Sequence, residues 1–156
     1  MKKIETFTLS ETRFLSNFYP YKKDGSKFAH HVSVIYNDIE FDCVENAYQT
    51  AKSLDVSLQK QMVKMSPYET KSYWDERRDE VRPDWQDIKY QIMKNLVEQK
   101  FYGSSELSHL LLQTGNCLLE EGNDWGDTYW GIDMESGAGE NHLGKILMQI
   151  RAKLLK

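Results

Sequence analysis

Apolar residues recur at intervals of three and four along most of this chain, a spacing that predicts amphipathic helices. The longest predicted helix begins near Asp84 and runs to Gly103, a residue type that often follows a helix C-terminus. We expect it to be the central packing helix of the fold. Its apolar stripe consists of Trp85, Ile88, Ile92 and Leu96, with Phe101 a little off the stripe.

Two further helices are indicated by N-terminal capping signals. Asp42 is followed three residues later by Glu45, which predicts a capping box at the start of a helix over residues 42–54. Ser66 repeats the pattern as an N-cap, with Pro67 at the first helical position. The helix over 42–54 is expected to bury Val44, Ala47, Tyr48, Ala51 and Leu54.

The remaining segments complete a mainly α protein with a small β element near its N-terminus. Asn37 and Asp38 separate two β-prone runs, which predicts a short hairpin. Helical spacing returns over residues 104–115 and again in the final segment. Between those two helices, residues 120–141 combine glycines, acids and two tryptophans. That mixture predicts an ordered loop, the kind of segment that often carries function. The final helix is marked by Leu143, Ile146, Leu147, Ile150 and Leu154.

The length of 156 residues and the 40% hydrophobic content predict one compact folded domain over residues 1–156. The net charge of -4 argues against a protein that covers phosphates or anionic lipid with positive charge. No apolar run approaches the roughly 20 residues that cross a bilayer, so no membrane association is expected. Cys43 and Cys117 show no disulfide pattern, and the chain starts without an apolar leader. We therefore expect a protein of the reducing cytoplasm.

Three polar residues share a narrow stripe of the helix predicted over 42–54. Glu45, Gln49 and Lys52 fall within about 60° of one another, beside the apolar face, where they could line the edge of a cleft. The alternative is structural, because Glu45 occupies the capping position, and glutamine and lysine are good helix formers on a surface. The two interpretations are compatible, since a helix N-terminus also holds a carboxylate ionised and in place. The stripe alone leaves the choice open.

The segment FLSNFYP, residues 14–20, places Asn17 beside Phe18 in a turn with aromatic anchors. Taken alone it is an ordinary turn, although such an asparagine could hydrogen-bond a ligand that stacks on the ring. Together with VENAYQTAK, VRPDWQDIK, LLLQTG, TYWGID and GENHLGKILMQIR, it resembles the YbiA-like or NADAR family. These motifs follow the family's order from residue 14 to residue 151, and therefore cover nearly the whole chain.

The resemblance implies a compact, single-domain, mainly helical fold and an N-glycosidase that cuts a bond between ribose C1 and nitrogen. Family members act on phosphoribosylamino-pyrimidine intermediates of riboflavin synthesis or remove ADP-ribose from guanine. The expected partner is a small ribosyl or ADP-ribosyl molecule, or ADP-ribosylated guanine within nucleic acid. By motif position, the implied site consists of Glu45, Trp85, Asp127 and Trp130, with Asn17, Phe18, Gln49, Lys52, Gly131 and Asn141 nearby.

The residue types suit that chemistry. Breaking the bond builds positive charge on the ribose and negative charge on the leaving nitrogen, so a carboxylate and a proton donor each lower the barrier. Glu45 and Asp127 are the expected pair. Lys52 offers a second route, in which its amine captures C1 as a Schiff base before water releases the sugar. Trp130, set among glycines, is expected to stack on the base, while Trp85 at a helix start fits a core position equally well.

Phosphate groups of a substrate have two candidate contacts. Arg77, Arg78 and Arg82 could neutralise one phosphate, and free backbone N–H groups in SGAGENHLG, before the last helix, could hold another. A plain helix-entry turn explains the second segment equally well. The four histidines lack metal-ligand spacing, so we expect neither a metal nor a cofactor.

Two non-enzymatic functions stay open from sequence. A non-catalytic nucleotide or ADP-ribose binding module would keep the stacking and phosphate contacts without needing Glu45 or Lys52. A partner-binding protein would use the aromatic loop over 120–141 as an interface. Binding without turnover distinguishes the first from an enzyme, and the lack of a thermal shift with ADP-ribose distinguishes the second.

Overall fold

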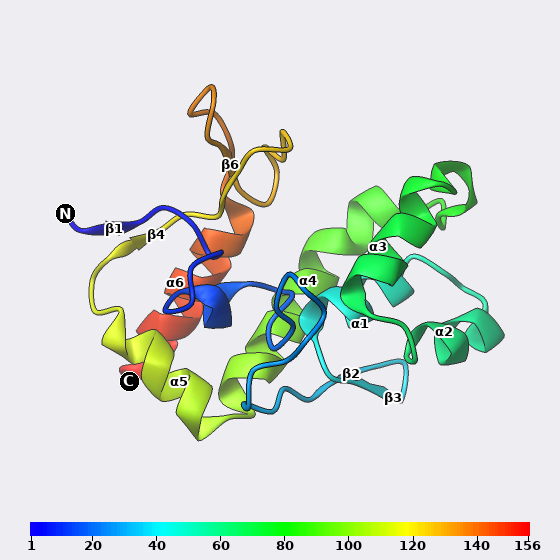
Figure 1. Ribbon diagram of the computed structural model, residues 1–156, viewed down its shortest axis with the longest axis horizontal. Coiled ribbons are helices and arrows are strands. Elements are labelled where there is room, and N and C mark those ends of the chain that lie inside the picture. The colour runs from blue at the N-terminus through cyan, green and yellow to red at the C-terminus, as the bar shows by residue number, and fades with distance from the viewer. The chain divides into compact units, whose positions relative to one another are not determined.

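The computed structural model describes residues 1–156 and is mainly α-helical, as the apolar spacing predicts (Figure 1). Six α-helices carry the fold, and every strand is only two or three residues long. The chain divides into two compact units, residues 17–103 and residues 1–16 with 104–156. Because of this division, the single domain over residues 1–156 stays a prediction. None of the helices has the length and apolar character needed to span a membrane.

In the unit of residues 17–103, the predicted hairpin is confirmed. Strand β2 (Val34–Tyr36) pairs antiparallel with β3 (Ile39–Phe41) in the register Val34 to Phe41. Asn37 and Asp38 both have positive φ, 49° and 61°, as a two-residue turn of this hand requires. Asparagine and aspartate tolerate this conformation better than other residues with a side chain, so the turn is encoded locally.

Helix α3 (Pro67–Asp75) begins as predicted. Ser66 Oγ accepts a hydrogen bond from Glu69 N at 3.2 Å, and the Glu69 carboxylate accepts one from Ser66 N at 2.9 Å. The two bonds satisfy donors that a bare helix end would leave unpaired. The short helix α2 (Val56–Met62) precedes it and is capped by the carboxylate of Asp55.

Helix α1 (Val44–Thr50) does not start with the predicted capping box. The N-cap is Cys43, whose Sγ accepts a backbone hydrogen bond from the first turn, and burial raises the pKa of this thiol to about 12. The Asp42 carboxylate instead accepts hydrogen bonds from Tyr21 at 2.8 Å and Lys27 at 2.7 Å. Tertiary partners thus compete successfully for the side chain that the local pattern assigns to the cap.

The predicted end of α1 is also wrong. The helix stops at Thr50, and Leu54, expected in the core, is 66% exposed. The other predicted core positions of this segment are buried, namely Val44, Ala47, Tyr48 and Ala51.

Helix α4 (Trp85–Tyr102) has the predicted limits, with Asp84 before it and Gly103 after it. It is not the most enclosed helix, because Ile88 and Ile92 are only half-buried. That position belongs to α1, which contacts α3, α4 and β2 and is buried at every residue. The polar side chains of α1 therefore have to find partners inside the protein.

The other unit combines the N-terminal segment with the last third of the chain. Its helices are α5 (Ser105–Gln113), where Ser104 caps the start and Gly115 has φ 59° just beyond the end, and α6 (His142–Leu154). A 3-10 turn covers Arg13–Leu15. The strands pair in parallel, β1 (Lys3–Ile4) with β4 (Leu118–Leu119) and β5 (Gly122–Asn123) with β6 (Ile132–Asp133).

Candidate active site

Glu45 and Gln49 lie one turn apart on α1 and are both buried. Gln49 Nε2 donates a hydrogen bond to Glu45 Oε1 over 2.7 Å. Two members of the polar stripe predicted from the sequence are thus in direct contact. The bond fixes the rotamer of the carboxylate and leaves its chemistry available, because an ionised carboxylate can accept several hydrogen bonds.

The turn at Asn17 holds the start of α1 in place. Asn17 O accepts a hydrogen bond from Glu45 N at 2.9 Å, so the asparagine backbone satisfies a donor in the first helical turn. The Asn17 side chain is buried, and its Nδ2 lies 3.3 Å from Met93 Sδ on α4. The segment FLSNFYP and the glutamate helix, separate in sequence, are therefore neighbours in the fold, as their shared motif membership implies.

Lys52 lies just beyond the end of α1. Its Nζ is 5.9 Å from the centroid of the Tyr48 ring and 5.8 Å from that of Trp85. Burial is the main cause that lowers the pKa of this amine, and the cations Lys71 and Lys89 act in the same direction. The charges of Glu45 and Asp75 oppose the shift. An amine with a lowered pKa is more often neutral and therefore a better nucleophile near neutrality.

Two aromatic pairs accompany these polar groups. Tyr48 and Trp85 pack with ring centroids 4.9 Å apart, and Trp85 is only 6% exposed. Phe18 and Tyr68 lie 5.0 Å apart, and Lys71 Nζ is 5.9 Å from the Phe18 ring. Trp85 is therefore a packed ring, which agrees with the structural interpretation of this tryptophan.

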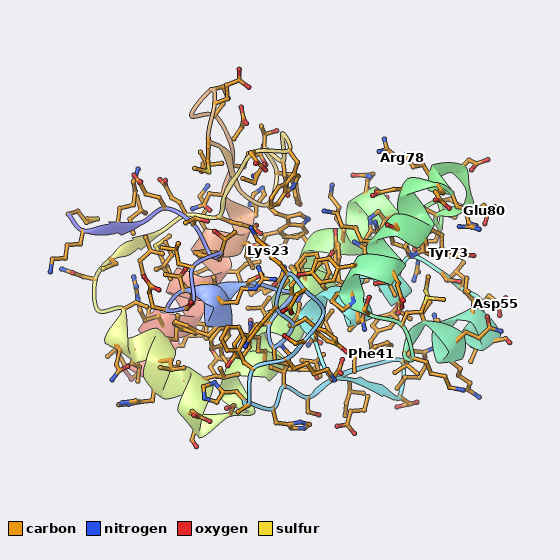
Figure 2. The ribbon with its side chains drawn as sticks, viewed as in Figure 1. Lys23, Phe41, Asp55, Tyr73, Arg78 and Glu80 are labelled. Atoms are coloured by element: carbon orange, nitrogen blue, oxygen red, sulfur yellow. The ribbon has the colours of Figure 1, made fainter.

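The two arginines predicted to bind substrate have different surroundings. Arg82 forms a bidentate pair with Asp84, with Nε to Oδ1 at 2.6 Å and Nη2 to Oδ2 at 3.0 Å. A substrate phosphate would have to compete with that carboxylate. Arg78 is exposed, and Figure 2 shows its side chain at the outer edge of the turn that follows α3. Their binding role stays a prediction.

Asp127 belongs to the other unit and organises the predicted loop. Its Oδ1 accepts hydrogen bonds from Tyr129 N and Trp130 N, both at 3.0 Å. The buried Asn123 binds the backbone of Asp127 at both its N–H and its carbonyl. The half-buried Trp130 contacts the edge of Tyr129 with ring centroids 4.8 Å apart. The loop is thus ordered, as expected, and the pairing of Asp127 with Glu45 stays a prediction.

Gly131 and Asn141 have structural contacts that explain their residue types. A Cβ at Gly131 would lie 2.1 Å from Glu121 O, so only glycine fits that backbone approach. Asn141 uses both ends of its amide within the protein, with Nδ2 to Leu119 O at 2.8 Å and Oδ1 accepting from Glu121 N at 3.1 Å. These contacts hold the loop against β4, and contact of either residue with substrate stays a prediction.

The candidate phosphate contact at the start of α6, one of two interpretations of this segment, is not supported by the backbone hydrogen bonds of residues 140–143. The N–H groups of residues 140–143 are donated to carbonyl oxygens of residues 128–131, at distances of 2.7 to 3.3 Å. These donors are therefore not free to hold an anion. The segment SGAGENHLG is the helix-entry turn that the sequence also allowed.

Residues 6–155 match the model of the NADAR domain. The chain belongs to the NADAR family. A riboflavin biosynthesis protein of Vibrio vulnificus is 33% identical over 142 residues, 90% of this chain and 35% of that protein. N-glycosidase YbiA of Escherichia coli is 30% identical over 141 residues, 88% of this chain and 87% of that enzyme. This NADAR chain therefore spans about a third of the Vibrio protein and most of the Escherichia coli one.

The solved structure of Escherichia coli YbiA, determined by NMR, resembles this chain with a TM-score of 0.75 at 25% identity. The similarity covers 99% of this chain and 89% of that chain. The mainly helical NADAR fold implied by the sequence resemblance is thereby confirmed.

Three residues of this NADAR chain that act around the polar stripe are not indicated by its sequence motifs. Tyr68 and Lys71 on α3 both contact Phe18, and Lys89 on α4 acts on the charge of Lys52. The spacing of Tyr68 and Lys71 by three residues places them on one helix face, and Lys89 follows Trp85 by one turn. Those spacings are common on any helix, so they could not be singled out without knowing which elements meet.

Proposed function

We propose that this chain is an N-glycosidase that hydrolyses a ribose C1 to nitrogen bond. The proposed substrate is a phosphoribosylamino-pyrimidine intermediate of riboflavin synthesis, with ADP-ribosylated guanine as the alternative. The hydrolase class is supported by family membership and by relatives named N-glycosidase. The pyrimidine substrate is supported by the relatives of Vibrio vulnificus and Arabidopsis thaliana, both named riboflavin biosynthesis proteins.

One observation carries the proposal. Glu45 is a buried carboxylate fixed by Gln49 and by the backbone of Asn17, and its charge acts on the amine of Lys52. Burying a carboxylate away from water costs free energy that hydrogen bonds and nearby opposite charge offset. Positioned beside C1, the Glu45 carboxylate would stabilise the positive charge that develops on the ribose as the bond to nitrogen breaks.

Two routes from the bound substrate to the products fit these residues. In direct hydrolysis, water adds to C1 as the C1 to nitrogen bond breaks, and the leaving nitrogen gains a proton. In the second route, Lys52 Nζ forms a bond to C1 as the base leaves with its nitrogen protonated. The ribose ring then opens at its C1–O4′ bond to give the imine, O4′ takes up the proton that Nζ loses, and water hydrolyses the imine to sugar and free lysine. The lowered pKa of Lys52 favours the second route.

Asp127 and Trp130 belong to the other unit and keep the roles that the family resemblance implies for them as part of the proposal. Asp127 would protonate the leaving nitrogen, and the half-buried Trp130 ring would stack on the flat base. Phe18 and Tyr68, already paired with each other, would contact the ligand through ring surface. A cytoplasmic location is part of the proposal and rests on the use of free cysteines at positions 43 and 117.

The proposal is tested by a mass-spectrometric turnover assay on the whole chain. The phosphoribosylamino-pyrimidine and an ADP-ribosylated guanine nucleotide are incubated separately with the protein, and the released base and sugar are quantified. Release of the pyrimidine supports the first substrate, and release of guanine supports the alternative. Binding of either compound without release of its base would indicate a non-catalytic binding module and overturn the enzyme assignment.

A further inference from the structure

Six asparagine and glutamine side chains are buried in this protein, and two of them differ from the rest. In four, the protein itself hydrogen-bonds both ends of the amide: Asn46, Gln59, Asn123 and Asn141. In Gln49 and Asn17 the nitrogen has a partner but the oxygen has none. Both side chains are more than nine-tenths buried, at 4% and 6% exposure. Both residues also bind Glu45 directly.

The orientation of the Gln49 amide follows from its partner. Gln49 Nε2 donates to Glu45 Oε1 over 2.7 Å, and the charged form of Glu45 requires this orientation because an ionised carboxylate only accepts hydrogen bonds. The oxygen must then point elsewhere, as a buried acceptor. Reversing the amide would set two oxygens against each other and remove the hydrogen bond between Gln49 and Glu45.

Asn17 gives the second acceptor. Its Nδ2 lies 3.3 Å from Met93 Sδ, and a thioether sulfur has no hydrogen to donate. Reversal of this amide would leave Oδ1 without a donor as before. The backbone oxygen of Asn17 meanwhile binds Glu45 N, which keeps the residue beside the start of α1. Two residues with an unsatisfied side-chain acceptor are therefore bonded to the same glutamate, and a ligand that satisfies them needs hydrogen-bond donors.

We propose that Gln49 Oε1 and Asn17 Oδ1 accept hydrogen bonds from hydroxyl groups of the substrate's ribose, and that Gln49 recognises the 2′-hydroxyl. The inference rests on the proposed function, in which the Glu45 carboxylate lies beside ribose C1. The 2′-hydroxyl is attached to the carbon next to C1, and the Gln49 amide is bonded to that same carboxylate. Hydrogen bonds to this hydroxyl strengthen as positive charge develops on the sugar. The site is thus specific for ribosides over 2′-deoxyribosides.

Selectivity follows from the cost of leaving buried carbonyl oxygens without a donor. A site built to bind a hydroxyl rejects the analogue that lacks it more strongly than an apolar pocket rejects a change in size. Gln59 supplies the matched control, because it is equally buried and both of its amide atoms are bonded to Ser53 and Asn37.

The experiment measures the affinity of the full chain for ribose 5-phosphate and for 2-deoxyribose 5-phosphate by calorimetry. Wild type is expected to bind the ribose compound about tenfold more tightly. Gln49→Met should weaken binding of the ribose compound to the level of the deoxy compound and leave the deoxy compound unaffected. Gln59→Met should lower the melting temperature and leave the ratio of the two affinities as in wild type.

Equal affinity of wild type for the two sugars, or no binding of either, would overturn the proposal. An equal loss for both sugars in Gln49→Met would also overturn it, because that result is expected of a merely structural glutamine. The wild-type comparison needs no variant, and Asn17→Leu provides a second variant if Gln49→Met does not fold. The binding experiment requires no turnover, so its outcome is independent of the glycosidase assay. Failure of the proposed function would be seen in that assay as substrate that stays intact.

Discussion

Gln49 lies one turn after Glu45 on α1 and donates a hydrogen bond from its Nε2 to Glu45 Oε1 over 2.7 Å. This contact joins the one buried acid of that helix to a side chain whose oxygen is still unsatisfied. A purely structural pair would satisfy both ends of the amide, as Asn46, Gln59, Asn123 and Asn141 do. The hydrogen bond between Gln49 and Glu45 therefore leaves the Gln49 oxygen available to accept a hydrogen bond from a ligand.

Replacing Glu45 with glutamine tests the role of its charge. Glu45→Gln keeps the side-chain shape and an oxygen for Gln49, but it cannot carry negative charge or exchange a proton. We expect kcat to fall by at least about a hundredfold with little change in melting temperature. Steady-state kinetics and thermal unfolding measure the two effects. Glu69→Gln, at the exposed capping box of α3, is the control and should retain turnover.

Trapping with borohydride tests the nucleophilic route through Lys52. Borohydride added during turnover should reduce the imine and attach the sugar covalently to the protein. Peptide mapping is expected to place the added mass on Lys52. If no adduct forms and Lys52→Ala keeps most of its activity, the lysine is an electrostatic contact, and attack by water assisted by Glu45 or Asp127 replaces this route.

The lowered pKa of Lys52 predicts a pH dependence of stability. Between the lowered folded pKa and the unfolded value near 10.5, the unfolded chain binds the proton and the folded chain does not. The free energy of unfolding should therefore rise with pH in that window and level off above it. Urea unfolding at a series of pH values should show the rise in wild type and its loss in Lys52→Met. Lys60→Met removes one charge from an exposed position of α2 and serves as control; if it reproduced the effect, Lys52 would not be its source.

The two tryptophans of the motif should respond differently to alanine. Trp85 is packed against Tyr48, so Trp85→Ala is expected to lower the free energy of unfolding by about 3–5 kcal/mol. Trp130→Ala should cost less stability and raise KM by about tenfold, because the ring is proposed to stack on the base. Thermal unfolding and kinetics give both quantities. A large loss of stability with unchanged KM in Trp130→Ala would assign that ring to the core.

Arg82 either stabilises the fold through its ion pair with Asp84 or binds a substrate phosphate, and substitutions distinguish the two roles. Its pair with Asp84 is partly exposed, so Arg82→Lys should lower the free energy of unfolding by under about 1 kcal/mol. Asp84→Asn should leave stability almost unchanged, and on the structural interpretation neither variant changes KM. A rise in KM confined to Arg82→Lys would show that the guanidinium binds the substrate phosphate.

Local signals predicted the parts of the fold that depend on a few adjacent residues. The Asn37 and Asp38 turn and the Ser66 capping box form as expected because their partners lie within three residues. The Asp42 capping box does not form, since Tyr21 and Lys27 reach that carboxylate from another part of the chain. Local signals also fail to show how α6 begins, because its first N–H groups are bonded to carbonyl oxygens of the preceding loop.

The candidate site divides in the same way. The amino-acid sequence by itself determined the helical class, the family and the stripe of Glu45, Gln49 and Lys52, because periodicity and ordered motifs are properties of the linear chain. Only the tertiary structure decided that α1 is enclosed on all sides, that burial lowers the pKa of Lys52, and that the oxygens of Asn17 and Gln49 stay unsatisfied. Desolvation and hydrogen-bond satisfaction depend on what surrounds a group in space, and α3, α4 and β2, which surround α1, come from segments whose meeting no local pattern specifies.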